Sequence, residues 1–366
     1  MARRYAVTLL GYGHLPKPIA DVTMVPVTEP ADMSRRLRKM AYLPLGKYLH
    51  PAFYEWWYAH EAEFQFTLRA LLAAQPAVIH ANDWEALPVA VQAAKKLNAQ
   101  VVLDLHEYSP GIQEESRYWR AFYKPSIEYF LRKYLPAVAA TITVGDAVAQ
   151  RYVDEFGFRP ITVMNVPTYR AQVAFKPCDP HCIRLVHHGV AMRNRFLELM
   201  IQAVANADPK FQLHFMLVEH HPGYVAELKQ LGQQLAPGRV FFHSPVAPDE
   251  VVQQIAQFDM GFFLLPPVNF NYQAAMPNKF FDFIHAGLAV LIGPSLEMSR
   301  VTQQYEFGVV APSFEPAAAA QVLNQLQTAE IDQMKQNALQ ASKLINVDAE
   351  MAKMLAIYDK LLPVDG

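Results

Sequence analysis

Short apolar runs alternate with stretches of helical periodicity along the first half of the chain. The runs have the length of buried strands, and the stretches between them repeat apolar residues every three or four positions. This alternation predicts a mostly parallel sheet with helices on both faces. The predicted strands are Tyr5–Leu10, Ala77–Ala81, Val101–Leu105, Ala140–Val144 and Ile161–Met164. The predicted helices lie near Tyr54–Ala74, Leu87–Leu97, Ser126–Tyr134 and Ala147–Glu155.

The same alternation restarts after Val166–Cys182, a Pro-containing stretch that we interpret as a linker. The second set of predicted strands is Ile183–His187, Gln212–Val218, Arg239–Phe242, Met260–Leu264, Leu288–Ile292 and Gly308–Val310. Helices are predicted at Arg195–Ala205, Tyr224–Leu235, Pro248–Gln257, Lys279–Ala286, Met298–Tyr305, Pro316–Gln327 and within Asp332–Leu361. We therefore expect two doubly wound α/β domains, over residues 1–168 and 183–345.

Composition excludes several classes of protein. A length of 366 residues suits about two domains. The net charge of −2 argues against a nucleic-acid partner, and no apolar run reaches the length of a membrane span. The two cysteines, Cys178 and Cys182, with the histidine between them are too few ligands for a structural zinc, so no metal site is expected. Scarce cysteine favours a reducing compartment, which predicts a cytoplasmic protein.

The segment Met276–Gly293 carries the most specific chemical pattern. Asn278 is a suitable N-cap and Gly287 a suitable C′ residue for a short helix that leads into a buried strand. Lys279 lies in the first turn of that helix, where free backbone N–H groups already favour an anion. Asp282, one turn further on, is placed to accept hydrogen bonds from sugar hydroxyls. Phosphate plus ribose fits this pair, and the alternative is a surface ion pair without a ligand.

Polar residues also follow the predicted strands, where open α/β sheets bind their ligands. His106 and Glu107 follow Val101–Leu105, and Asp83 follows Ala77–Ala81. A histidine at a strand end can take part in catalysis, although a lone histidine is more often a hydrogen-bonded core residue. In the second half the predicted strand Ile183–His187 leads into a glycine and a basic helix start, a second phosphate-type pattern formed by Gly189, Asn194 and Arg195.

In these segments the chain resembles the GT-B glycosyltransferases, specifically the retaining enzymes of family 4, which use nucleotide-sugar donors. The similar segments occur in the family's order over most of the chain. They are Val78–Pro88, Val101–Pro110, Ile142–Gly145, Asn165–Pro167, His187–Gly189 with Arg195, and Pro277–Val290.

The resemblance implies two Rossmann-like domains that face a cleft, with the acceptor held mainly by the first and the donor by the second. Arg195 and Lys279 would bind the donor diphosphate, and Asp282 would bind the donor ribose. His106 would lie beside the transferred sugar. The last helix, about residues 350–366, would complete the first domain. No cofactor is implied, because the nucleotide-sugar is a substrate.

Two positions depart from the family pattern. An acidic residue common in the family is replaced here by Ala274, and Tyr5–Leu10 corresponds to the family's second strand. Either the true start lies upstream, or the first strand of the N-terminal domain is missing. Two alternatives stay open: a nucleotide-sugar epimerase on the same fold, and an inactive GT-B binding protein, for which these two departures are the evidence. A dinucleotide dehydrogenase is disfavoured because no Gly-x-Gly-x-x-Gly follows a predicted strand.

Basic and aromatic residues are interleaved in two parts of the first half. This composition suits an anionic lipid-linked acceptor or peripheral contact with the inner face of a membrane. The alternative is that the aromatic side chains pack inward and the charges are solvated. The sequence leaves the acceptor, saccharide or lipid-linked, and the nucleotide base open. The residues are Arg35, Arg36, Arg38, Lys39, Lys47, Tyr42, Tyr48, Trp56, Trp57 and Tyr58, and the run Arg117–Lys124.

Overall fold

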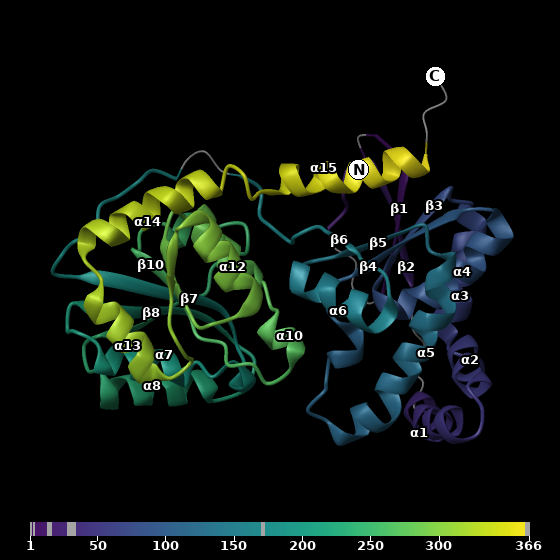
Figure 1. Cartoon of the computed structure of the whole chain (residues 1–366), viewed down its shortest axis with the longest axis horizontal. Coiled ribbons are helices and arrows are strands. Elements are labelled where there is room, and N and C mark those ends of the chain that lie inside the picture. The colour runs from purple at the N-terminus through teal and green to yellow at the C-terminus, as the bar shows by residue number, and fades with distance from the viewer. Residues whose placement is uncertain (1, 3, 13–16, 28–33, 170–172, 363–366) are drawn as a thin grey trace. The chain divides into compact units, whose positions relative to one another are not determined.

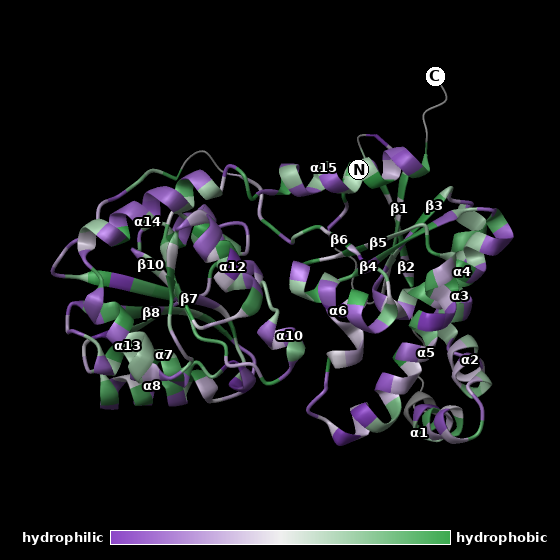
Figure 2. Cartoon of the chain, in the orientation of Figure 1, coloured by the Kyte–Doolittle hydropathy of each residue, from purple (hydrophilic) through white to green (hydrophobic). Residues whose placement is uncertain are grey.

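A computed structural model describes the chain except residues 1, 3, 13–16, 28–33, 170–172 and 363–366. The chain divides into two compact units, residues 1–163 with 353–366, and residues 164–352. Both units are built from parallel strands and helices, as predicted. Figure 1 shows the elements of each unit, and Figure 2 shows that the strands are mainly hydrophobic while the helices also carry hydrophilic positions.

Unit 1 contains two separate parallel sheets among its described strands. The first joins β1 (Val7–Tyr12) to β2 (Val22–Val27), and the second has the order β3-β4-β5-β6. The four strands of the second sheet are β3 (Val78–Asn82), β4 (Gln100–Leu105), β5 (Ala140–Thr143) and β6 (Ile161–Thr162). The sequence predicted these four strands and β1 but not β2. Pro26 lowers the strand signal of β2, since proline cannot donate a ladder hydrogen bond.

The helices of unit 1 largely match the predicted ones, with two differences. The stretch Tyr54–Ala74 forms two helices rather than one, and the basic stretch before it is also helical. The helices are α1 (Ser34–Tyr48), α2 (Ala52–Ala59), α3 (Ala62–Ala74), α4 (Asp83–Leu97), α5 (Lys124–Tyr134) and α6 (Asp146–Phe156). Three shorter turns are η1 (Ser109–Gly111), the π-helical η2 (Trp119–Tyr123) and η3 (Leu135–Ala137).

Unit 2 is built around one six-stranded sheet with the order β12-β11-β10-β7-β8-β9. Its strands are β7 (Ile183–Ala191), β8 (Phe211–Glu219), β9 (Val240–His243), β10 (Met260–Phe263), β11 (Ala289–Ile292) and β12 (Gly308–Val310). The helical elements are η4 (Arg193–Arg195), α7 (Glu198–Asn206), α8 (Tyr224–Leu235), α9 (Val251–Ile255), α10 (Phe270–Gln273), α11 (Asn278–His285), α12 (Leu296–Tyr305), α13 (Pro316–Gln325) and α14 (Thr328–Ala341).

Alternate residues of each strand in the unit 2 sheet point to opposite faces, and both faces are buried by helices. Met260 and Phe262 of β10 belong to a core that includes α7, α8 and α13. Phe263 of the same strand belongs to a second core with α9, α11, α12 and α14. Figure 1 shows α7, α8 and α13 together on one side of the sheet. This two-sided burial explains why the strands read as continuous apolar runs.

The last helix, α15 (Val347–Leu361), begins in unit 2 and ends in unit 1. Its unit 1 portion packs on the sheet β3-β4-β5-β6, where Ile357 and Tyr358 form a small core with Val102 and Ile142. Over the part of the chain that the structure describes, no helix combines the length and hydropathy that crossing a membrane requires.

Candidate functional site

The sheet of unit 2 changes its direction of growth between two neighbouring strands. After β7 the chain adds β8 and β9 on one side, and then β10, β11 and β12 on the other. All five pairings are parallel, so the carboxyl ends of the strands share one edge. The switch point lies between β7 and β10, and in open α/β sheets such a point is the usual ligand site.

Lys279 lies against both strands of this switch point. Its Nζ is 3.0 Å from Nε2 of His187 on β7 and 4.8 Å from the ring centroid of Phe263 on β10. The His187 Nδ1 atom lies 3.0 Å from the carbonyl oxygen of Phe262, so Nδ1 carries the ring proton and Nε2 accepts from the lysine. Lys279 is only 5% exposed. Among the described residues, no carboxylate lies within ion-pair distance of its amino group.

The electrostatic setting of Lys279 opposes its charge. Burial, and then the Arg195 guanidinium, lower the pKa of Lys279 well below its usual value, while Asp282 acts in the opposite direction. The pKa of His187 is also well below its usual value, first because the ring is buried and second because of Lys279. His187 is therefore a neutral acceptor. An anion beside Lys279 and Arg195 would favour the charged lysine through charge-assisted hydrogen bonds.

Of the three predicted residues that precede α7, Gly189 and Arg195 lie near Lys279, whereas Asn194 does not contact it. Gly189 has a φ of +113°, and a Cβ there would lie 3.4 Å from the Lys279 Nζ, so the backbone approaches the amino group closely. Arg195 is half-buried and close enough to Lys279 to lower its pKa. Asn194 is exposed, and Arg193 pairs with Glu227 through contacts of 2.6 and 2.8 Å.

The ends of α11 differ slightly from the prediction. Pro277 takes the N-cap position with extended backbone, so the prediction of Asn278 as N-cap is wrong by one residue. Asn278 is instead the first helical residue, and it is exposed. Gly287 follows the C-cap with a φ of +66°, which confirms its predicted role.

Asp282 lies on α11 one turn beyond the helix start. Its Oδ2 is 3.4 Å from Nε2 of His188, the β7 residue next to His187. Burial, and then Lys279, lower the pKa of His188 to about 3, so this imidazole is neutral. Ala274, where the family often has an acid, is 2% exposed. Of the predicted donor residues, Gly189, Arg195, Lys279 and Asp282 therefore gather in one region of unit 2.

The predicted residues of unit 1 lie at the carboxyl ends of two paired strands. Asp83 follows β3 at a φ of +58°, and its Oδ1 accepts a hydrogen bond of 3.1 Å from the His106 backbone N–H. The His106 side chain is 41% exposed, so the alternative of a core histidine is wrong. Burial raises the pKa of both Asp83 and Glu107, and for Glu107 the nearby Asp83 charge adds to this effect.

Three residues beside the predicted ones were missed. The carboxylate that faces the His106 ring belongs to Asp104, whose Oδ2 is 3.7 Å from His106 Nε2. Between Glu107 and His106, the described part of the chain shows no side-chain hydrogen bond or ion pair. His80 contacts the same Asp104 oxygen, and His187 holds Lys279. The available signal was a polar side chain inside an apolar strand, since each of these residues sits within β3, β4 or β7.

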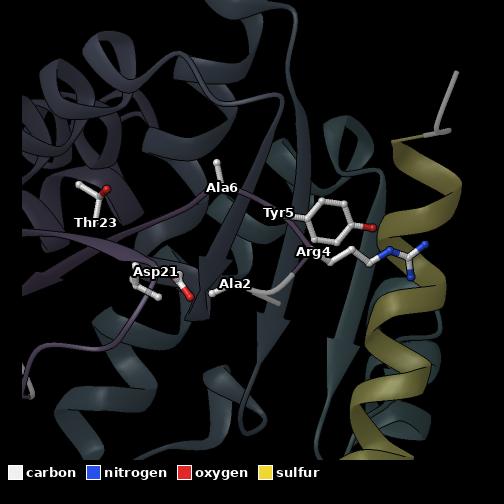
Figure 3. Close-up of a pocket in the computed structure, with 7 residues that line it drawn as sticks. Ala2, Arg4, Tyr5, Ala6, Asp21 and Thr23 are labelled. Carbon is white, nitrogen blue, oxygen red and sulfur yellow. The ribbon is translucent and has the colours of Figure 1, made fainter.

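A pocket of about 650 Å³ opens elsewhere in unit 1, at the start of β1 and β2. None of the predicted site residues lines it. Figure 3 shows Arg4 and Tyr5 extending toward α15, where both contact Asp359, at 2.9 and 2.8 Å respectively. Among the described residues, no three His, Cys, Asp or Glu side chains are placed to hold a metal ion together.

Comparisons with known proteins agree with this architecture. Residues 2–167 match the family model described as Glycosyltransferase Family 4. HepE from Anabaena, solved with UDP-glucose, is 14% identical, with 98% of this chain and 100% of HepE covered and a TM-score of 0.66. Sucrose-phosphate synthase from Thermosynechococcus elongatus is 16% identical, with 98% and 90% covered and a TM-score of 0.66. No curated protein matched the chain.

A glycosyltransferase from Rickettsia africae is 11% identical, with 93% of this chain and 85% of that chain covered and a TM-score of 0.65. Likeness at such low identity shows a shared fold, whereas the family match covers the N-terminal segments quoted above. Residues 2–167 therefore match Glycosyltransferase Family 4, and the chain as a whole has the GT-B fold of these solved structures.

Proposed function

We propose that the protein transfers a hexose from a UDP-sugar, with retention of configuration, to a saccharide or lipid-linked acceptor in cell-surface polysaccharide or glycolipid synthesis. The observation that carries the proposal is Lys279, a buried lysine at the switch point of the unit 2 sheet with a neutral histidine as its partner. A buried amino group is costly unless it meets an anion, and the leaving group of this reaction is a nucleoside diphosphate.

The donor residues supply the charge that such a reaction needs. As the glycosidic bond breaks, negative charge develops on the phosphate oxygens, and fixed cations stabilise it. Lys279 and Arg195 would share this role with the free N–H groups at the start of α11. Asp282 would accept hydrogen bonds from the ribose hydroxyls. In unit 1, His106 would contact a hydroxyl of the transferred sugar.

UDP-glucose is the first donor to test. HepE was solved with UDP-glucose, and a trehalose-phosphate synthase from Burkholderia vietnamiensis with the same fold is described as UDP-forming. The experiment is a panel of nucleotide-sugars, screened for thermal stabilisation, then for binding by calorimetry and for release of nucleoside diphosphate. The Lys279→Met variant keeps much of the side-chain volume and is the matched control for the cation.

The expected result is stabilisation by one nucleotide-sugar, release of its nucleoside diphosphate with an acceptor present, and loss of binding in Lys279→Met. Release of an epimerised sugar would support the epimerase instead. Tight binding without turnover on any acceptor would support an inactive binding protein. Unchanged binding in Lys279→Met would show that the anion site lies elsewhere.

A lipid-linked acceptor is favoured by the surface of α1 and the loop after it. Trp57 packs inward, as the alternative interpretation proposed, but Tyr48 and the nearby Leu37 and Leu49 are each 69% exposed. Lys47 lies beside this surface, with its Nζ 5.2 Å from the ring centroid of Tyr48. Exposed apolar side chains next to cations suit the interface of an anionic membrane. The side chains of Arg35 and Arg36 lie outside the described residues.

This part of the proposal has its own test. Binding to phosphatidylcholine vesicles with and without phosphatidylglycerol is measured by co-sedimentation. We expect binding only to the anionic vesicles, and loss of it in Leu37→Glu and Leu49→Glu. Leu344→Glu is the matched control, since Leu344 is 63% exposed and lies in unit 2. Equal binding by all three variants would exclude this surface as the contact.

A further inference from the structure

A chain of polar side chains runs across one face of the unit 1 sheet toward His106. On β4, Val102 and Asp104 are two residues apart, so they share a face, and His106 continues this spacing just past the strand end. Val102 packs against α15 through Ile357 and Tyr358. Asp104 therefore lies on the face that α15 covers. Its side chain is 12% exposed, compared with 41% for that of His106.

One carboxylate oxygen faces two imidazoles. The Asp104 Oδ2 is 3.3 Å from His80 Nε2 and 3.7 Å from His106 Nε2. The first distance is a hydrogen bond, and the second is an ion-pair distance that a small movement of the ring would shorten. Among the described residues these two histidines are the ion-pair partners of Asp104.

The direction of the hydrogen bonds follows from Tyr358 on α15. Its hydroxyl lies 2.6 Å from His80 Nδ1, and the two rings are stacked with an interplanar angle of 4°. Burial, and then the Asp104 charge, raise the pKa of Tyr358 to about 12, so the hydroxyl is protonated and donates. His80 Nδ1 therefore accepts, and Nε2 carries the ring hydrogen that is donated to Asp104.

We infer that Asp104, held in place by His80 and Tyr358, is the positioning residue that fixes the His106 ring for its contact with substrate. With Nε2 of His106 facing Asp104, Nδ1 is the atom directed away from the carboxylate. Nδ1 has no hydrogen-bond partner among the described residues. A carboxylate behind a histidine fixes both the ring orientation and the tautomer. Tyr358 is held in place on the sheet because it packs with Ile357, Val102 and Ile142 in one apolar cluster.

The inference rests on the proposed role of His106, so its test has a readout that does not depend on turnover. The ring signals of His106 are followed by NMR in a chain with carbon-labelled histidine, and are assigned through His106→Gln. Asp104→Asn keeps the side-chain shape but removes the negative charge. We expect it to change the His106 tautomer signature. Asp154→Asn is the control, because Asp154 is an exposed acid of unit 1 that accepts a 2.8 Å hydrogen bond from Gln150.

Turnover supplies the second readout. We expect Asp104→Asn to lower kcat by about ten- to hundredfold, the usual scale for a residue that orients a functional side chain, with the donor KM nearly unchanged. Asp104→Glu should recover part of the loss. His80→Phe should cost less than Asp104→Asn, and Tyr358→Phe less again, because each acts one contact further from His106.

The two readouts separate the possible failures. Unchanged His106 signals in Asp104→Asn overturn the positioning role, whatever the turnover. In a second outcome, Asp104→Asn changes the His106 signals while the unmodified chain turns over no nucleotide-sugar. That result supports the positioning role and overturns the proposed function. If Asp104→Asn does not fold, His80→Phe and Tyr358→Phe carry the same comparison, and unchanged signals and kcat in both would overturn the inference.

Discussion

The amino group of Lys279 lies 3.0 Å from Nε2 of His187, a fully buried histidine on the central strand of the unit 2 sheet. A lysine held by a neutral histidine keeps its capacity to bind an anion, because no carboxylate of the described residues lies within ion-pair distance of its amino group. The pair therefore fixes the position of an amino group whose charged form a bound anion would favour. This arrangement sets the expected behaviour of the donor site.

Replacing Lys279 by alanine should weaken binding of the nucleoside diphosphate by about 1.5–3 kcal/mol, the scale of a charge-assisted hydrogen bond. Isothermal calorimetry with UDP measures this change. Lys229→Ala, on α8, is the control, and it should bind UDP like the unmodified chain. A loss below a few tenths of a kcal/mol for Lys279→Ala would contradict the assignment.

Binding of UDP should be accompanied by proton uptake. The pKa of Lys279 is lowered in the free protein by burial and by Arg195, and a bound diphosphate would raise it again. The complex then binds more protons than the free protein, so affinity falls as pH rises between the two pKa values. Calorimetry at pH 8 in buffers of different ionisation enthalpy measures the uptake, because the phosphates of UDP, with a second pKa of about 6, are already ionised there.

Lys279→Met should abolish that proton uptake. The lowered pKa of Lys279 also makes the free energy of unfolding depend on pH. Between the lowered pKa and the unfolded value of about 10.4, the unfolded chain binds more protons, so the ligand-free protein gains stability as pH rises through this range. Proton uptake that persists in Lys279→Met would assign the titration to another group.

Gly189→Ala should weaken both stability and nucleotide binding. The φ of +113° strains any L residue by about 1–3 kcal/mol, and the new Cβ would lie 3.4 Å from the Lys279 Nζ. Gly238→Ala is the matched control, since Gly238 has a φ of +74° and a Cβ there would meet no atom of another segment within 4 Å. Thermal unfolding should show a loss in both variants, whereas calorimetry should show weaker UDP binding only in Gly189→Ala.

Asp282→Asn should lower nucleotide affinity while the fold stays intact. The side chain is partly exposed on α11 and contacts His188 at 3.4 Å, so its loss leaves no large cavity. Thermal unfolding without ligand and calorimetry with UDP are compared for the same preparation. A large loss of unfolding temperature with unchanged UDP affinity would make Asp282 a structural residue of the helix.

His106→Ala should lower turnover by roughly a hundredfold or more, with little change in donor affinity, because a contact that strengthens in the transition state is expressed in kcat. Steady-state kinetics and UDP-sugar binding are measured together. His60→Ala is the control, since His60 is not one of the residues at the carboxyl ends of β3 and β4. Turnover equal to that of the unmodified chain would remove His106 from the mechanism.

The pattern of apolar residues was sufficient to predict the two-part α/β fold and most of its strands. Parallel strands covered on both faces need continuous apolar runs, and such runs are visible in the sequence at β10 and β11. The pattern failed at β2, where Pro26 interrupts the strand signal, and it joined α2 and α3 into one helix. Local preference is weak at these places, and packing against neighbouring elements decided the outcome.

The predicted site residues were identified by their chemistry at strand and helix ends, which is also readable from sequence. The buried residues that contact them could not be identified from the sequence. His187 lies 92 positions from Lys279, and Tyr358 lies 278 positions from His80. These contacts depend on which strands become neighbours and on where α15 packs. The sequence determined the fold class and the reactive residue types, whereas only the tertiary structure decided which buried partner fixes each reactive side chain, because that depends on distances between segments far apart in the chain.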